Sequence, residues 1–381
     1  MRKEALSSLC KDRFILMNKD KKVALLSVGS NVAYIDKIYS EIPHYIEDIY
    51  SWIQDRTTIF GRDNLLMMAK IAGISNEVEF LSISKALSIN DTLWVNDLKN
   101  PTTWNKVNPY TNRLSRIMAD MAINGIDNYR NQNIKSPSPQ YRVDGSVDKC
   151  IKRKDGKLYL YKTDGEKWSD LAGCRPYSEY YVSELCKISG INNFTEYNIE
   201  IHRTESNKIK PYTCCKIFTD EKNGLVQMCD TKMHRIEMQE LIRRIPKQSA
   251  KTILDMAVLD SITLNFDRHS GNYGFIVDND NYSIKCVAPI YDNDYALGSL
   301  TSLQGKSIEE AFNELKATRL PKLGVGDYDD MARWGMTKDM YNKLRSLEQV
   351  KLKQLPGISD KRIEFINYII NRRIKEVINL F

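Results

Sequence analysis

The stretch VLDSITLNFDRHSGNYGFIVDNDNYSIKCVAPIYDNDYALG, residues 258–298, decides how the rest of the chain is interpreted. It contains Asp267 and, five residues later, Asn272. An apolar, strand-like segment then leads to Tyr291 and Asp292, which places a second acid at the end of a β-type segment. A carboxylate, an amide and another carboxylate therefore follow one another in one short region.

Phosphoryl transfer requires this set of side chains. Asp267 can orient an attacking hydroxyl and accept its proton, while Asn272 and Asp292 can hold the magnesium ions that neutralise phosphates. In protein kinases the base and the amide have the same five-residue separation, because one short loop directs both toward the nucleotide. The alternative is a polar turn without chemistry, since Asp, Ser, Gly and Asn are common turn residues.

Residues 265–274, NFDRHSGNYG, and residues 288–292, APIYD, resemble the catalytic and metal-binding segments of the HipA-like serine/threonine kinases. The resemblance implies an α+β, bilobed protein-kinase-like fold, with a β-rich N-lobe and a helical C-lobe. It also implies that the protein uses ATP and Mg²⁺. It implies that Asp267 is the base and that Asn272 and Asp292 are the metal ligands. His269 would support the loop beside the base, although it is also explained as a polar turn residue.

A lysine and a glutamate supply the second half of such a site. The alternating strand over 158–162 places Lys162 on a face with leucines, where a buried ammonium requires an anionic partner. In the helix predicted over 176–190, Glu179 lies on the apolar side, whereas Glu184 lies opposite and should be solvated. We therefore predict that Lys162 holds the α/β-phosphates and that Glu179 positions it. The alternative is a surface ion pair of little energetic value.

Two further segments would contact the nucleotide in a kinase. Gly145 and Ser146 precede the strand of Lys162 and would lie over the phosphates, with one glycine where eukaryotic kinases use three. The strand predicted over 211–218 ends at the hinge position, where the backbone near Lys216 and Phe218 would bond the adenine edge. Its two adjacent cysteines are interpreted as small buried hydrophobic residues.

The resemblance also has implications for partners. HipA-like proteins are often the toxin halves of toxin–antitoxin pairs, and some autophosphorylate a serine in the ATP loop. An antitoxin partner, a protein substrate and modification of Ser146 are therefore expectations here. Two other functions stay open: a phosphatidylinositol or other small-molecule kinase, and a non-catalytic binding module on a kinase fold. A DNA-bound repressor partner has only the family analogy behind it.

The composition excludes several classes of protein. The 381 residues are 42% hydrophobic and 28% charged, which is typical of a soluble globular protein with sizeable cores. A net charge of +7 is mild for this length and gives no independent support for nucleic-acid binding. Eight cysteines without a C-x-x-C pair indicate no zinc framework and a reducing compartment. Without an apolar signal core or a membrane-spanning run, the sequence predicts a cytoplasmic protein that does not contact membranes.

The order of patterns predicts the domain organisation. Residues 1–130 form a small α/β N-terminal domain of unknown role, in which edge packing of two tryptophans, Trp94 and Trp104, is expected. The Pro/Ser/Asn-rich residues 131–141 are a linker, 142–220 the kinase N-lobe and 221–381 the kinase C-lobe. Other predicted elements are hairpins over 14–28 and 275–287, a strand over 196–202, and helices over 62–73, 253–262, 308–315 and 362–381.

Overall fold

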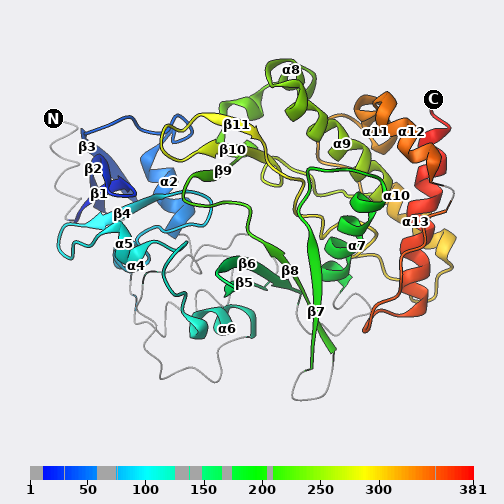
Figure 1. Ribbon diagram of the computed structural model, residues 1–381, viewed down its shortest axis with the longest axis horizontal. Helices are drawn as coiled ribbons and strands as arrows, with labels where there is room; N and C mark the ends of the chain where they lie inside the picture. Colours follow the sequence, from blue (N-terminus) through cyan, green and yellow to red (C-terminus); the bar gives the residue numbers. More distant parts are fainter. Residues whose placement is uncertain are drawn as a thin grey trace. The chain divides into compact units, whose positions relative to one another are not determined.

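The computed structural model of the protein describes residues 12–29, 31–57, 74, 76–124, 137, 148–164, 174–203, 209–347 and 349–381 (Figure 1). The chain forms two compact units, each assembled from separate stretches of sequence. The first unit comprises Met1–Leu160, Ile217–Val226 and Ile276–Ile284, and the second comprises Tyr161–Lys216, Gln227–Phe275 and Lys285–Phe381. The predicted helix over 62–73 and, apart from residue 137, the predicted linker over 131–141 lie outside the described residues.

A four-stranded antiparallel sheet lies in the first unit. Its strands have the spatial order β3-β2-β1-β4 and are β1 (Asp12–Asn18), β2 (Lys21–Gly29), β3 (Val32–Ile38) and β4 (Leu93–Asp97). The hairpin predicted over 14–28 is confirmed, with Asn18 opposite Lys21. Lys19 takes a left-handed conformation, at φ 50°, which lets the chain reverse between β1 and β2.

The described part of the first unit also contains the helices α2 (Ile49–Thr57), α4 (Glu77–Ser84), α5 (Trp104–Val107) and α6 (Arg116–Asn124). Trp94 and Trp104, for which edge packing was expected, are both buried and pack in one apolar cluster. The Trp104 Nε1–H also donates to Glu221 Oε1 at 2.8 Å. A buried ion pair between Arg56 and Asp91 joins α2 to the segment before β4. These contacts give the first unit its own packed interior.

Two further sheets, of four and three strands, have the strand orders β5-β6-β8-β7 and β11-β10-β9. Their strands are β5 (Asp148–Lys154), β6 (Lys157–Thr163), β7 (Tyr197–Arg203), β8 (Ile209–Lys216), β9 (Asn223–Gln227), β10 (Gly274–Asp278) and β11 (Ile284–Val287). β7 and β8 pair antiparallel, with Tyr197 opposite Cys215. The strand predicted over 211–218 starts and ends slightly earlier in the structure, at Ile209 and Lys216, so Phe218 lies beyond it. The hairpin predicted over 275–287 is confirmed as β10 and β11.

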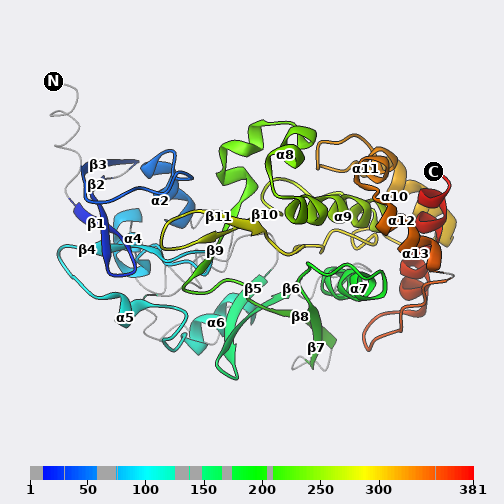
Figure 2. The same cartoon turned by 45° about the horizontal axis from the view of Figure 1, so that its top comes forward.

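The second unit is mainly helical. Its α-helices are α7 (Cys174–Ile188), α8 (Met238–Arg244), α9 (Lys247–Thr263), α10 (Ile308–Thr318), α11 (Tyr328–Gly335), α12 (Lys338–Ser346) and α13 (Asp360–Ile378), and the 3-10 helices η2 (Met228–Asp230) and η3 (Lys232–Arg235) precede α8. α9 contacts α8, α11 and α13 (Figure 2). Residues on most sides of α9 are buried, as expected from a sequence that is apolar nearly all round the helix.

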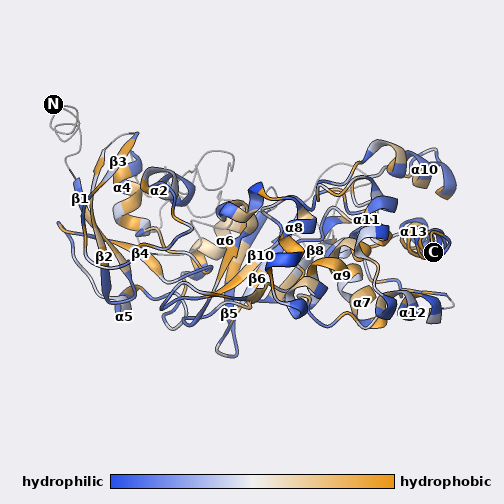
Figure 3. Cartoon of the chain, turned by 90° about the horizontal axis from the view of Figure 1, so that it is seen from above, coloured by the Kyte–Doolittle hydropathy of each residue, from blue (hydrophilic) through white to orange (hydrophobic). Residues whose placement is uncertain are grey.

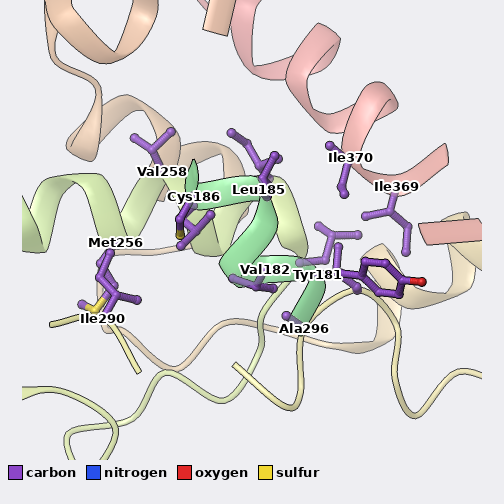
Figure 4. Close-up of a cluster of buried hydrophobic side chains, with 14 of the residues drawn as sticks. Tyr181, Val182, Leu185, Cys186, Met256, Val258, Ile290, Ala296, Ile369 and Ile370 are labelled. Atoms are coloured by element: carbon purple, nitrogen blue, oxygen red, sulfur yellow. The ribbon is translucent and has the colours of Figure 1, made fainter. Parts of the chain in front are cut away.

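One hydrophobic cluster joins α7, α9 and α13. In Figure 4 Tyr181, Val182, Leu185 and Cys186 of α7 face Met256 and Val258 of α9 and Ile369 and Ile370 of α13. Ile290 and Ala296 belong to the same cluster. These two residues bracket the segment that contains Asp292, so the hydrophobic core fixes that segment at both of its ends.

Local signals in the sequence account for the helix ends. The Ser307 side chain and the Glu310 side chain form a reciprocal capping box at the start of α10. The helix predicted over 176–190 begins earlier, at Cys174, which leaves Pro176 in the first turn, where proline is tolerated. In α13 the apolar residues at helical spacing are buried, as the sequence predicted for Ile363, Ile366, Ile370, Ile374 and Val377. Figure 3 shows both hydrophobic and hydrophilic residues in this helix, which is seen end-on.

The predicted domain ranges stay a prediction. The two units cut across them, because the chain passes from the first unit into the second within β6. Across the described residues, no helix combines the length and the apolar character that a membrane span requires.

Candidate functional site

Lys162 lies near the end of β6, and its side chain is almost completely buried. Its Nζ is 2.5 Å from Glu179 Oε1 and 2.6 Å from Asp292 Oδ1. The structure thus brings together three predicted residues that are far apart in the sequence. Burial alone would lower the pKa of Lys162, but the charges of Asp292 and Glu179 raise that pKa well above its ordinary value. Lys162 is therefore a permanent cation at neutral pH.

Helix α7 presents Glu179 to this lysine. Glu179 is completely buried, and it shares the inner face of the helix with Val182 and Cys186. Its second oxygen, Oε2, accepts the backbone N–H of Asn293 at 2.9 Å. One carboxylate therefore holds both the lysine and the segment that contains Asp292. Glu184, in contrast, is partly exposed and pairs with Lys187 near the end of the helix.

Asp292 has an unusual backbone. Its φ of 58° is left-handed, a conformation that costs free energy for most residues and less for Asp and Asn. The Asp292 N–H donates to the Tyr197 hydroxyl at 3.2 Å. Burial raises the pKa of Tyr197 well above its ordinary value, so this hydroxyl stays neutral. Strained backbone of this kind concentrates at functional sites, where the surrounding structure holds it in place.

Asp294 is the residue most easily confused with Asp292 in the sequence. The structure separates them, because Asp294 Oδ2 pairs with Arg175 Nη2 at 2.6 Å and both side chains are buried. The Arg175 guanidinium in turn lies 4.2 Å from the centre of the Tyr295 ring. Asp294 therefore has a structural cation of its own, and Asp292 is the acid that meets Lys162.

Asp267 and Asn272 lie in the loop between α9 and β10. The Asn272 side-chain nitrogen donates to the Asp267 carbonyl at 2.9 Å. This bond closes the loop and engages the amide nitrogen, which leaves the amide oxygen to act as a ligand. The Asp267 carboxylate is 17% exposed, and its Oδ1 accepts from Lys322 Nζ at 2.6 Å. The base predicted from the sequence is thus accessible and has a cationic neighbour.

Arg268 joins this loop to the Asp292 segment. Its guanidinium is completely buried and binds both Asp260 oxygens, at 2.8 and 3.0 Å. Its Nη1 also donates to the backbone carbonyls of Asn272 at 2.8 Å and Tyr291 at 2.5 Å. Burial lowers the pKa of Arg268, but the Asp260 charge more than offsets this and raises the pKa above its ordinary value. One side chain therefore fixes the predicted amide ligand and the predicted acid ligand together.

Neither Arg268 nor Asp260 was assigned a role from the sequence. The signal for this pair is the spacing: Asp260 is an acid within the apolar α9, and Arg268 follows it eight residues later in a polar loop. Asn293 was also missed: its side-chain oxygen accepts from Arg268 Nη2 at 2.5 Å. Its carbonyl accepts the Ser178 hydroxyl at 2.8 Å, which ties it to α7.

His269 lies next to the predicted base and is 48% exposed. Its Nδ1 accepts the Gly271 N–H at 3.0 Å, and its Nε2 is 3.8 Å from Asp267 Oδ2. A Cβ on Gly271 would come within 2.8 Å of the imidazole, so glycine leaves room for this contact. His269 is placed to support the loop, and its role stays a prediction.

The predicted nucleotide contacts are only partly visible. Gly145 and Ser146 lie outside the described residues. Lys216 is the exposed last residue of β8 in the second unit, whereas Phe218 is half-buried and belongs to the first unit. Their proposed bonds to adenine stay a prediction. Cys214 and Cys215 are both buried in β8, as expected for small hydrophobic residues.

The donor set fits a magnesium ion. Among the described residues no three His, Cys, Asp or Glu side chains come together to form a metal site. Mg²⁺ does not require such a cage, because it is usually bound by one or two protein oxygens together with phosphates and waters. The Asn272 amide oxygen and the Asp292 carboxylate are the oxygens that would hold it here.

An ion-pair test follows from the contacts of Lys162. Replacing it with methionine is expected to lower the free energy of unfolding by about 3 kcal/mol, because two carboxylates lose their cation. Burial raises the pKa of Glu179, and the Lys162 ammonium opposes that shift, so the variant should raise it further. A carboxyl with a folded-state pKa above its unfolded value, about 4.3, adds stability below that pH and loses it as pH rises through the folded pKa. The deficit of the variant should therefore grow as the pH rises above the unfolded pKa of about 4.3, measured by urea unfolding.

Lys187→Met is the matched control for this variant. Lys187 pairs with Glu184 at 3.0 Å on the exposed surface of the same unit, so its replacement should change stability by less than about 1 kcal/mol. A deficit in Lys162→Met that is constant over the whole pH range would contradict the assignment of these carboxylates.

Comparison with known proteins leaves the family open. No family model matches this chain, and no curated protein matches it. A similar solved structure is the crystal structure of a Helicobacter pylori proinflammatory kinase, CtkA. The likeness has a TM-score of 0.47 and 20% sequence identity, and it covers 61% of this chain and 92% of that chain. A likeness this distant assigns neither a fold nor an activity to the chain.

Proposed function

We propose that this protein is an ATP- and Mg²⁺-dependent kinase of the HipA-like type, which transfers the γ-phosphoryl group to a serine or threonine hydroxyl of a protein. One observation carries the proposal. Lys162 Nζ lies within 2.6 Å of both Glu179 and Asp292, and Arg268 ties the Asp292 segment to the loop of Asp267 and Asn272. The residue types, their order along the chain and their contacts all agree with a phosphoryl-transfer site.

Each side chain has a distinct role in this reaction. Asp267 orients the attacking hydroxyl and accepts its proton as the new oxygen–phosphorus bond forms and the bond to the ADP leaving oxygen breaks. Lys162 holds the α/β-phosphates, and Glu179 keeps its ammonium in place. Asn272 and Asp292 supply oxygens for magnesium, which neutralises phosphate charge when bound. Gly145 and Ser146 are proposed to cover the phosphates, and the backbone near Lys216 and Phe218 to bind adenine.

Several finer parts of the proposal come from the family resemblance. These are an antitoxin partner and autophosphorylation with Ser146 as the acceptor. A cytoplasmic location, which was expected from the composition, also belongs to the proposal. The bilobed arrangement, with an N-lobe over 142–220 and a C-lobe over 221–381, belongs to the proposal in the same way.

The test is incubation of the purified chain with γ-labelled ATP, with and without Mg²⁺, in the presence of a lysate as a pool of proteins. We expect label on protein hydroxyls that is lost when Mg²⁺ is chelated. Phosphatidylinositol vesicles form a parallel arm, and label on inositol lipid alone would replace the protein-kinase assignment by a small-molecule kinase. Absence of Mg²⁺-ATP binding by calorimetry would leave a non-catalytic module and overturn the proposal.

A further inference from the structure

Lys322 is a second lysine at the candidate site, and the proposed function gives it no role. It lies in the segment between α10 and α11, and its Nζ is 2.6 Å from Asp267 Oδ1. Lys162 is buried between two carboxylates, whereas Lys322 is 54% exposed and is paired with one. A half-exposed ion pair costs little to open, so Lys322 can turn toward a different anion.

The backbone around Lys322 is fixed on both sides. Leu323, the next residue, is buried in the hydrophobic core of the second unit. Before it, the Arg319 guanidinium lies 5.0 Å from the centre of the Phe266 ring, and Phe266 directly precedes Asp267. The segment therefore packs against the loop of the base through Arg319 and into the hydrophobic core through Leu323. The proximity of Lys322 to Asp267 follows from this packing and not from the lysine side chain alone.

The position of the base sets the distance to the phosphoryl group. An attacking hydroxyl lies roughly 2.6–3.2 Å from its general base. Reacting atoms approach to roughly 3–3.5 Å before bond formation. Only the oxygen of the attacking hydroxyl therefore lies between the Asp267 carboxylate and the transferred phosphorus. An ammonium that touches the same carboxylate, on a flexible and partly exposed stem, lies within reach of the phosphoryl oxygens.

We propose that Lys322 is a γ-phosphate-binding residue of this site, distinct from Lys162, which holds the α/β-phosphates. This inference rests on the proposed function. In phosphoryl transfer, negative charge is spread over the equatorial oxygens of the transferred group, and cations around those oxygens stabilise it. Neither Asp267 nor Asn272 supplies positive charge, and the Lys162 ammonium is shared between Glu179 and Asp292. Lys322 provides that charge on the side of the attacking hydroxyl.

The inference predicts a difference between two nucleotides. ADP lacks the γ-phosphate, so Lys322→Met should weaken binding of Mg²⁺-ATP by about 10- to 100-fold, as for the loss of a charge-assisted hydrogen bond, and leave Mg²⁺-ADP unchanged. Isothermal titration calorimetry on the full chain measures both constants without depending on catalysis. Lys322→Arg keeps the charge and should recover most of the ATP affinity.

Lys306→Met is the matched control, because Lys306 also pairs with one carboxylate, Glu314, in the same unit. It should bind both nucleotides like the unmodified chain. Equal affinities of Lys322→Met and the unmodified chain for ATP, or equal losses for ATP and ADP, would overturn the inference. Faster transfer by Lys322→Met with unchanged ATP affinity would instead make the lysine a cap on the base. If the unmodified chain binds neither nucleotide, the proposed function itself fails, so the two failures are distinguishable.

Discussion

Replacing Asp267 with asparagine is expected to slow phosphoryl transfer by about 100- to 10,000-fold, the usual contribution of a general base. The amide keeps the size of the carboxylate but cannot accept the hydroxyl proton. Because the Asp267 carbonyl, and not its carboxylate, accepts the Asn272 amide, the loop should keep its shape. The measurement is the transfer rate of γ-labelled phosphate at saturating ATP, with ATP affinity determined separately by calorimetry.

Asp339→Asn is the control for this variant. Asp339 is an exposed acid in the same unit that pairs with Lys343 at 2.9 Å, so its loss should leave the transfer rate within about twofold. A rate for Asp267→Asn that is similarly close to the unmodified rate would show that another group accepts the proton. A change in ATP affinity without a change in the rate would also remove Asp267 from the role of base.

Replacing Arg268 with methionine should destabilise the protein by about 5 kcal/mol, because it leaves the Asp260 carboxylate buried without a cation. It also removes the donor to the backbone carbonyls of Asn272 and Tyr291. The loop of the base and the Asp292 segment then lose their common partner. We expect transfer to slow even in the fraction that stays folded, since both predicted magnesium ligands move. Urea unfolding measures the first effect, and the transfer rate at low temperature measures the second.

A double-mutant cycle separates this pair from a general loss of packing. The double variant with Asp260→Asn and Arg268→Met leaves neither charge unpaired. Its loss in the free energy of unfolding should therefore be smaller than the sum of the two single losses by about 1–3 kcal/mol. Arg243→Met is the surface control, because Arg243 is exposed and pairs with Glu240 at 3.5 Å. Additive losses in the cycle would contradict the role given to the Asp260–Arg268 pair.

Part of the site was predictable because it depends on periodicity. Alternation along a strand places Lys162 on the buried face, and the helical repeat places Glu179 on the apolar side of α7. A buried lysine and a buried glutamate must find partners, and the structure shows that they find each other. The short spacing from Asp267 to Asn272 likewise confines both residues to one loop, which one hydrogen bond closes.

Other contacts could not be predicted, because no local pattern encodes them. Asp292 and Asp294 have nearly identical surroundings in the sequence, and only the position of Arg175 on α7 distinguishes them. Lys322 lies 55 residues beyond Asp267, in a region where the sequence predicted only a helix over 308–315. Its position depends on how α10 and α11 pack on the core. Tertiary packing, not propensity, determines these partners.

The double pairing of Lys162 has a consequence for the order in which ligands bind. Asp292 Oδ1 lies 2.6 Å from an ammonium, so the same carboxylate would have to serve two competing cations when a divalent ion arrives. A free metal ion must therefore displace Lys162 from one of its acids and should bind weakly by itself. A nucleotide that brings the metal also brings phosphates, which give the displaced ammonium a new anion. Under the proposed function, metal and nucleotide are thus expected to bind with positive cooperativity, through one shared carboxylate.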